Sequence, residues 1–308
     1  MKYKIQSKML AGARRQFCLD IGMDYEEYEQ NPNKKAYIVK SKYKEGTTLP
    51  GTEGARIYAG SDAFFWATIC MGQLFLCVDE QIYDWAVEEF SDCAPEWFCE
   101  YGNLRKIDEK LKEFGRKIGD THVYFLAGEV EDGNARARQM KVGTVPCAQP
   151  AAGIRPNAAK SDCHMSSDIG PGSFRWYEQE EILRFKEENR FDRALCFSPT
   201  QPDVLAVAAM RTVAEKTYDQ SNMAGMAGVS EDGKYLWQIG INVDDDYRGK
   251  GLAADLVCML KEEVIRRGKI PFYGTSESHI ISQTVGLKAG FVPAFTSVYV
   301  KPLEQGYV

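Results

Sequence analysis

The most constraining feature of this sequence is an alternation of strand-like and helix-like segments in its C-terminal third. The apolar, strand-like runs lie at 203–210, 223–230, 234–243, 270–274 and 291–300, and the amphipathic, helix-like stretches at 252–267 and 278–289. Residues 231–233 read Glu-Asp-Gly, a turn signal, so the runs on either side predict an antiparallel hairpin. Strands that alternate with helices in this way predict a mixed α/β sheet.

A short glycine-containing loop joins the predicted hairpin to the first of these helices. It reads Arg248-x-x-Gly251-x-Ala253. Glycines let the backbone approach a ligand, and the first turn of a helix offers unpaired N–H groups at the positive end of its dipole, which suits a pyrophosphate. The spacings of a P-loop and of a dinucleotide fingerprint are both absent. The same residues could equally form a plain loop before a helix, so the motif alone leaves both interpretations open.

The order of elements around this loop resembles the GNAT superfamily of acyl-CoA-dependent N-acyltransferases. The family signature, Gln/Arg-x-x-Gly-x-Gly/Ala, is matched by the loop above, and a late helix of the form Asn-x-x-Ser/Ala followed by Gly-Phe is matched by His279-x-x-Ser282 with Gly290 and Phe291. The resemblance covers about residues 203–301. The strings at 237–241, 271–275 and 278–283 look like a bacterial subgroup that carries an extra N-terminal domain.

The resemblance implies that acetyl-CoA is the cosubstrate and that its acetyl group passes to an amine by direct attack. It implies that the strand before the loop diverges from the parallel strand at 270–274 to hold the thioester. Val243 would offer backbone groups to the pantetheine arm, and Ser282 would contact the cofactor. The residues expected to surround the pyrophosphate are Arg248, Gly249, Lys250, Gly251, Leu252 and Ala253. The acceptor would be a small-molecule or peptide amine.

One departure from the family pattern concerns proton transfer. Many GNAT enzymes carry a tyrosine on the late helix that protonates the leaving thiolate, and Gly286 stands at that place here. Three neighbouring residues are therefore candidate catalytic groups: His279, Tyr273 and Glu277. An imidazole titrates near neutrality, but His279 could instead begin the helix. Tyr273 could belong to the core, and Glu277 could simply favour the helix N-terminus.

The composition changes sharply between the two halves of the chain. Residues 146–172 carry several prolines, alanines and glycines and little hydrophobic periodicity, which is typical of a linker. We therefore predict an N-terminal α/β domain at 1–145, with strands at 35–40, within 64–79 and at 122–128 and helices at 80–90 and 104–117. The GNAT-like catalytic domain is predicted at 173–308 with its own core, opening on a helix at 176–189. The N-terminal domain could be a degenerate copy of the same fold.

Composition and charge narrow the functional classes. Lys+Arg is 38 and Asp+Glu is 44, for a net charge of −6, so a dedicated nucleic-acid partner is not expected. No apolar run approaches the roughly 18–20 residues that span a bilayer, and no signal peptide is recognisable, so we expect a cytoplasmic protein without a membrane partner. The nine cysteines lack a C-x-x-C pair, which favours reduced thiols and predicts no metal site.

Three functions remain compatible with these observations. The first is an enzyme, an N-acetyltransferase that uses acetyl-CoA. The second is a non-catalytic module that binds acyl-CoA. The missing tyrosine slightly favours this module, whereas the intact loop and His279 favour the enzyme. The third is a tandem GNAT-like aminoacyl or peptidyl transferase, which requires a second copy of the fold in residues 1–145. A fold alone does not choose among them.

Overall fold

The computed structural model describes residues 4–41, 52–56, 62–129, 174–198, 201–211 and 216–304. The predicted linker at 146–172 lies outside these residues. Within the described ranges, no helix combines the length and the apolar character that a bilayer crossing requires.

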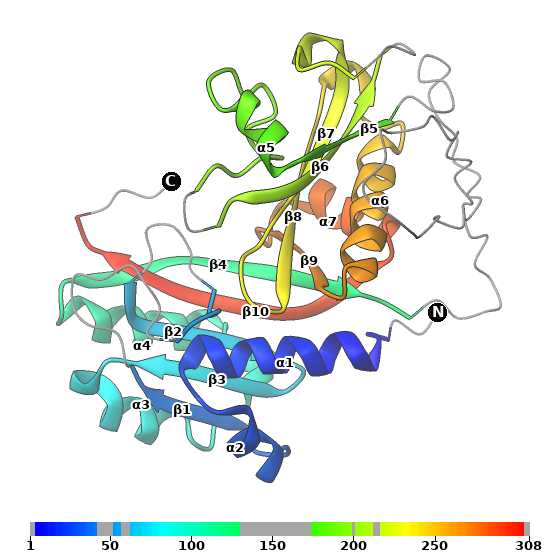
Figure 1. Ribbon diagram of the computed structural model, residues 1–308. Helices are drawn as coiled ribbons and strands as arrows, with labels where there is room; N and C mark the ends of the chain where they lie inside the picture. The colour runs from blue at the N-terminus through cyan, green and yellow to red at the C-terminus, as the bar shows by residue number, and fades with distance from the viewer. Residues whose placement is uncertain are drawn as a thin grey trace.

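One mixed sheet of ten strands runs through the molecule (Figure 1). Its order is β1-β3-β2-β10-β4-β9-β8-β7-β6-β5. The strands are β1 (Ala36–Lys40), β2 (Asp62–Cys70), β3 (Gln73–Val78), β4 (Arg116–Ala127), β5 (Phe174–Glu178), β6 (Asp203–Met210), β7 (Met223–Ser230), β8 (Leu236–Val243), β9 (Ile270–Thr275) and β10 (Phe291–Pro302). Among the strands of the described ranges, the β1–β3 and β8–β9 pairs are parallel and the others are antiparallel. The mixed α/β fold expected from the sequence is confirmed.

Helices cover both faces of the sheet. One face carries α1 (Ser7–Ile21), whose Phe17 lies in a cluster with Phe272 and Phe295. The short helix α2 (Tyr25–Gln30) joins that cluster through Tyr28. The opposite face carries α3 (Tyr83–Phe90), α4 (Tyr101–Lys112), α6 (Leu252–Arg266) and α7 (Ile280–Lys288). Side chains alternate across a strand, so neighbours such as Phe272 and Tyr273 belong to opposite layers.

The expectation of two separate cores is wrong. Strand β10, from the C-terminal end, lies between β2 and β4, and β4 lies between β10 and β9. The cluster under α1 accordingly combines Phe17 and Phe75 with Phe272 and Phe295. Long-range pairing of this kind has no local signature, because each strand reads the same whichever neighbour it joins. The domain bounds themselves, 1–145 and 173–308, stay a prediction.

Two predicted helices are corrected. Residues 176–189 do not form one helix: Phe174–Glu178 is the edge strand β5, followed by the single-turn helix α5 (Gln179–Ile182). The charge-rich stretch suggested a helix, but antiparallel pairing of Phe174–Glu178 with β6 outweighs that local preference. The helix expected at 104–117 is α4, which ends at Lys112, because Arg116 already begins β4.

The N-terminal strands repeat a pattern found in the C-terminal half. Along the series β6-β7-β8-β9 the pairings are antiparallel, antiparallel and parallel, and the same succession occurs in β10-β2-β3-β1. The connections differ, since β1 precedes the β2–β3 hairpin whereas β9 follows β7 and β8. That the N-terminal part is a degenerate copy of the GNAT fold therefore stays a prediction.

Candidate functional site

The glycine-containing loop lies between the end of β8 and the start of α6. Gly249 has φ 77° and Gly251 has φ 89°, both in the left-handed region that favours glycine. A Cβ built at either position meets no atom within 4 Å, so the backbone conformation and not crowding requires glycine here. Gly251 is the N-cap residue of α6. The loop thus brings exposed backbone to the positive end of a 15-residue helix.

The first turn of α6 can bind an anion. No side chain caps it, and the first intrahelical bond runs from the Asp255 amide to the Gly251 carbonyl at 3.2 Å. The amides of Leu252, Ala253 and Ala254 precede that bond and have no acceptor within the helix. Such amides, aided by the helix dipole, bind phosphate oxygens in many proteins.

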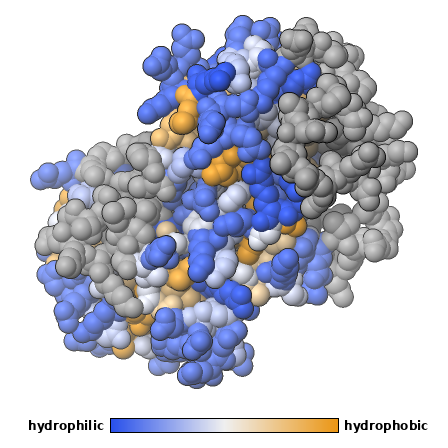
Figure 2. Space-filling view, in the orientation of Figure 1, coloured by the Kyte–Doolittle hydropathy of each residue, from blue (hydrophilic) through white to orange (hydrophobic). Residues whose placement is uncertain are grey.

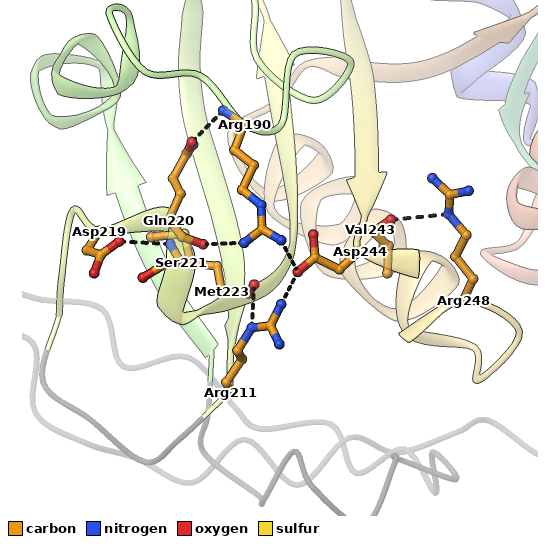
Figure 3. A network of polar contacts seen from close by, with 9 residues as sticks. All are labelled: Arg190, Arg211, Asp219, Gln220, Ser221, Met223, Val243, Asp244 and Arg248. Carbon is orange, nitrogen blue, oxygen red and sulfur yellow. Dashed lines mark hydrogen bonds and ion pairs between the residues drawn. The ribbon is translucent and has the colours of Figure 1, made fainter. Parts of the chain in front are cut away.

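Arg248 folds back over the end of β8 (Figure 3). Its Nε donates to the Val243 carbonyl at 3.3 Å, and its Nη1 lies 2.9 Å from Asp245 Oδ1. Lys250 follows in the loop, with its Nζ 5.2 Å from the ring centre of Tyr247. The guanidinium of Arg248 therefore lies at the strand end and is largely exposed to solvent.

Strands β8 and β9 separate before either ends. Their parallel pairing stops at Ile239 and Tyr273. Beyond that point β8 stays paired with β7 as far as Val243, and β9 stays paired with β4 as far as Thr275. The two strands are held on their outer sides but not to each other, which opens the sheet next to the loop.

Tyr273 and Ser282 meet beside this opening. The Tyr273 hydroxyl lies 2.6 Å from Ser282 Oγ, which α7 carries. Burial raises the pKa of Tyr273, and the hydrogen bond with Ser282 opposes this less strongly. A Cβ built on Gly286 would lie 3.1 Å from Tyr273 Cδ1. Glycine at the place of the missing helix tyrosine therefore leaves room for the ring of a tyrosine that comes from β9.

His279 and Glu277 lie at the exposed start of α7. His279 is the N-cap residue, but its side chain makes no capping hydrogen bond. The Glu277 carbonyl accepts from Gln283 Nε2 at 2.7 Å. The structure thus brings Tyr273 and Ser282 into contact. His279 and Glu277 lie at the N-terminal end of α7, the helix that also carries Ser282.

A network of polar side chains, which the sequence did not reveal, surrounds Asp244 (Figure 3). Asp244 directly follows β8, and its carboxylate accepts from Arg190 at 2.9 Å and from Arg211. These arginines are 54 and 33 residues away in the chain, and neither belongs to a motif. Only the acidic residues after the strand were visible as a sequence signal. In the described ranges, no three His, Cys, Asp or Glu side chains are grouped as metal ligands.

GNAT-family acetyltransferases recur among the solved structures that are similar to this chain. An acetyltransferase of the GNAT family from Colwellia psychrerythraea is 11% identical, covers 80% of this chain and 84% of its own, and has a TM-score of 0.32. A GCN5-related N-acetyltransferase-like protein from Streptococcus suis is 14% identical over 65% of this chain and 68% of its own, at a TM-score of 0.36. A Salmonella typhimurium protein, described as an acetyltransferase and solved with acetyl-CoA, is 13% identical over 44% of this chain and 95% of its own, at 0.28.

No family model matches the sequence, and no curated protein does.

Proposed function

We propose that this chain is an N-acyltransferase that moves an acetyl group from acetyl-CoA to an amine. The observation that carries the proposal is a juxtaposition at one strand. Strand β8 leads into the glycine-containing loop at the N-terminus of α6, and its pairing with β9 ends before it reaches that loop. This places an anion site next to the seam, the stretch where β8 and β9 are no longer paired. Such an arrangement suits a pyrophosphate joined to an extended arm.

The roles of the loop follow from this placement. The pyrophosphate would accept hydrogen bonds from the backbone of Gly249, Gly251 and the first turn of α6, with Arg248 and Lys250 supplying positive charge. The pantetheine arm would follow β8 toward the seam. The Val243 carbonyl already accepts from Arg248 Nε. A pantetheine amide that binds this carbonyl would share it with the arginine or displace it.

Acid–base chemistry is assigned to residues on the β9 and α7 side of the opening between β8 and β9. The amine nitrogen forms a bond to the acyl carbon, the bond from that carbon to sulfur breaks, and the leaving thiolate needs a proton. Tyr273 is the proposed donor, with Ser282 holding its hydroxyl. A raised pKa keeps the Tyr273 phenol protonated at neutral pH. His279 is the proposed base for the amine proton, with Glu277 beside it.

The decisive experiment uses two glycines of one helix. In Gly251→Asp, a side chain and a negative charge enter the proposed phosphate site, so the CoA dissociation constant should rise more than tenfold, roughly 1.4 kcal/mol. Gly268→Asp is the matched control, because Gly268 has φ 79° and open space but follows the opposite end of α6. If calorimetry finds equal CoA affinity in the two variants, the loop is not the CoA pyrophosphate site.

The absence of a tyrosine at position 286 favours the alternative of a non-catalytic acyl-CoA module. Steady turnover of acetyl-CoA with a panel of amines separates an enzyme from a module that only binds. The repeated strand succession in β10-β2-β3-β1 favours the other alternative, a tandem transferase for aminoacyl or peptidyl acceptors.

A further inference from the structure

A cavity of about 680 Å³ lies between the segment after α5 and the turn that precedes β7. Arg184 and Arg190 line it from the first segment, and Tyr218 and Gln220 from the second. The surface over this part of the molecule is predominantly hydrophilic (Figure 2). A cavity of this size and polarity suits a small polar molecule.

Gln220 brings an unused hydrogen-bond donor to the cavity. The residue is 6% exposed, and its Oε1 accepts from the Arg190 amide at 2.7 Å. That bond identifies which end of the side-chain amide is oxygen. Its Nε2 is buried and has no hydrogen-bond partner among the described residues. Buried donors are costly when unpaired, so a ligand oxygen is the natural partner.

The charges around the cavity have both signs. Arg190 reaches from the cavity to Asp244, which Arg211 also contacts, so two cations share one carboxylate there. The Arg184 guanidinium lies 4.3 Å from the ring centre of Tyr218. Glu187 and Glu188 are exposed and also line the cavity. Positive and negative groups together disfavour a phosphate dianion and favour a molecule that carries both a carboxylate and an ammonium group.

We propose that this cavity binds the carboxylate end of a zwitterionic ligand, an amino acid or a short peptide. The carboxylate accepts from Gln220 Nε2 and is attracted by Arg184 and Arg190. Because Arg190 also holds Asp244, the residue after β8, one arginine side chain links the bound molecule to the strand whose pairing with β9 has ended. The binding of this ligand does not depend on the proposed function, but its role as acyl acceptor does rest on it. If the ligand is the acceptor, the acceptor is an amino acid or a peptide and not a polyamine or an aminoglycoside.

Binding without CoA tests the inference directly. Calorimetry is run on the full chain with the twenty free amino acids and with amines that lack the carboxylate, such as cadaverine against lysine. At least one amino acid should bind, and its decarboxylated counterpart should bind tenfold more weakly or worse. Gln220→Glu keeps an oxygen for the Arg190 amide but replaces the free donor by a second carboxylate oxygen. It should weaken amino-acid binding at least tenfold.

Gln201→Glu is the matched control, since Gln201 also has a buried Nε2 without a partner but does not line the cavity. If Gln220→Glu does not fold, Arg184→Gln on the exposed rim replaces it and should weaken binding severalfold. Equal affinity for amino acids and plain amines, no binding of any amino acid at millimolar concentration, or equal effects of the two glutamine variants would overturn the inference. CoA affinity, measured on the same samples, reports separately on the loop and thus on the proposed function.

Discussion

At the scale of single residues, Tyr273 takes the space that a side chain at position 286 would need. Its ring lies against Gly286 and its hydroxyl reaches Ser282 across to α7. In the proposed mechanism, the strand therefore supplies the hydroxyl where the helix carries glycine. The identity of residue 286 and that of residue 273 have to be considered together.

Tyr273→Phe tests this arrangement with the loss of one oxygen atom. The ring and its packing remain, so CoA affinity should stay nearly unchanged, whereas kcat should fall about 10²-fold if the hydroxyl donates a proton. Tyr177→Phe is the control, because it also removes a buried hydroxyl, one that donates to the Thr217 carbonyl at 2.6 Å. Equal kcat in the two variants would move the proton donor elsewhere.

His279→Asn distinguishes a structural role of His279, as the N-cap residue of α7, from a catalytic role as the base. Asparagine is a good N-cap residue, so a structural role would survive the change. If His279 accepts the amine proton, kcat should fall about 10²-fold or more while CoA affinity is retained. Wild-type turnover of this variant between pH 6 and 9 would exclude His279 from the mechanism.

At the scale of elements, β6 begins with a carboxylate that burial disfavours. Asp203 is 3% exposed, and its Oδ2 accepts from the Cys196 amide at 2.9 Å. Burial raises the pKa of Asp203 to about 8. The strand is thereby joined to the 191–198 segment through a group that is most stable when protonated.

The pH dependence of stability should follow from this carboxyl. Between about pH 4 and 8 the unfolded chain has lost the Asp203 proton and the folded protein keeps it, so the free energy of unfolding falls as pH rises. The Asn side chain of Asp203→Asn stays neutral at every pH. The free energy of unfolding of this variant should therefore exceed that of the wild type increasingly as pH rises, by an amount on the order of a few kcal/mol at pH 8. Denaturant unfolding at pH 4 and 8 measures the difference. If the difference in stability between the variant and the wild type does not increase with pH, the buried Asp203 carboxyl is not the cause of the pH dependence.

At the scale of the whole molecule, the two halves of the chain share one sheet. Strand β10 pairs with β2 and β4, and the side chain of Gln16 on α1 accepts from the Tyr235 amide at 2.8 Å, next to β8. The buried Arg56–Asp20 ion pair, at 2.7 Å, lies close to Phe272 and Phe295. Because of contacts of this kind, we expect the two halves to unfold together.

Limited proteolysis should therefore cut the chain without separating it. The composition of 146–172 predicts the first cleavage there. The two fragments should still elute as one species in gel filtration, because β4 and β10 pair across the cut, and should separate only in denaturant. Fragments that elute separately in buffer would contradict a shared sheet, and first cleavage within 203–260 would contradict the domain boundary.

Local patterns in the sequence were enough to determine the C-terminal succession of strands and helices and the glycine loop. Periodicity, the turn at 231–233 and the glycines at 249 and 251 act within a few residues, so their consequences can be read without the rest of the chain. The β2–β3 hairpin around Gly72 is of the same kind. The predicted roles of the loop residues remain predictions about chemistry.

Only the tertiary structure decided what lies far apart in the chain. The insertion of β4 between β9 and β10, the edge strand at Phe174–Glu178, the fit of Tyr273 against Gly286 and the two arginines on Asp244 all depend on partners distant in sequence. Pairing and packing energies are set by which surfaces meet. That choice is made by the whole chain when it buries its apolar side chains, and no short segment records it.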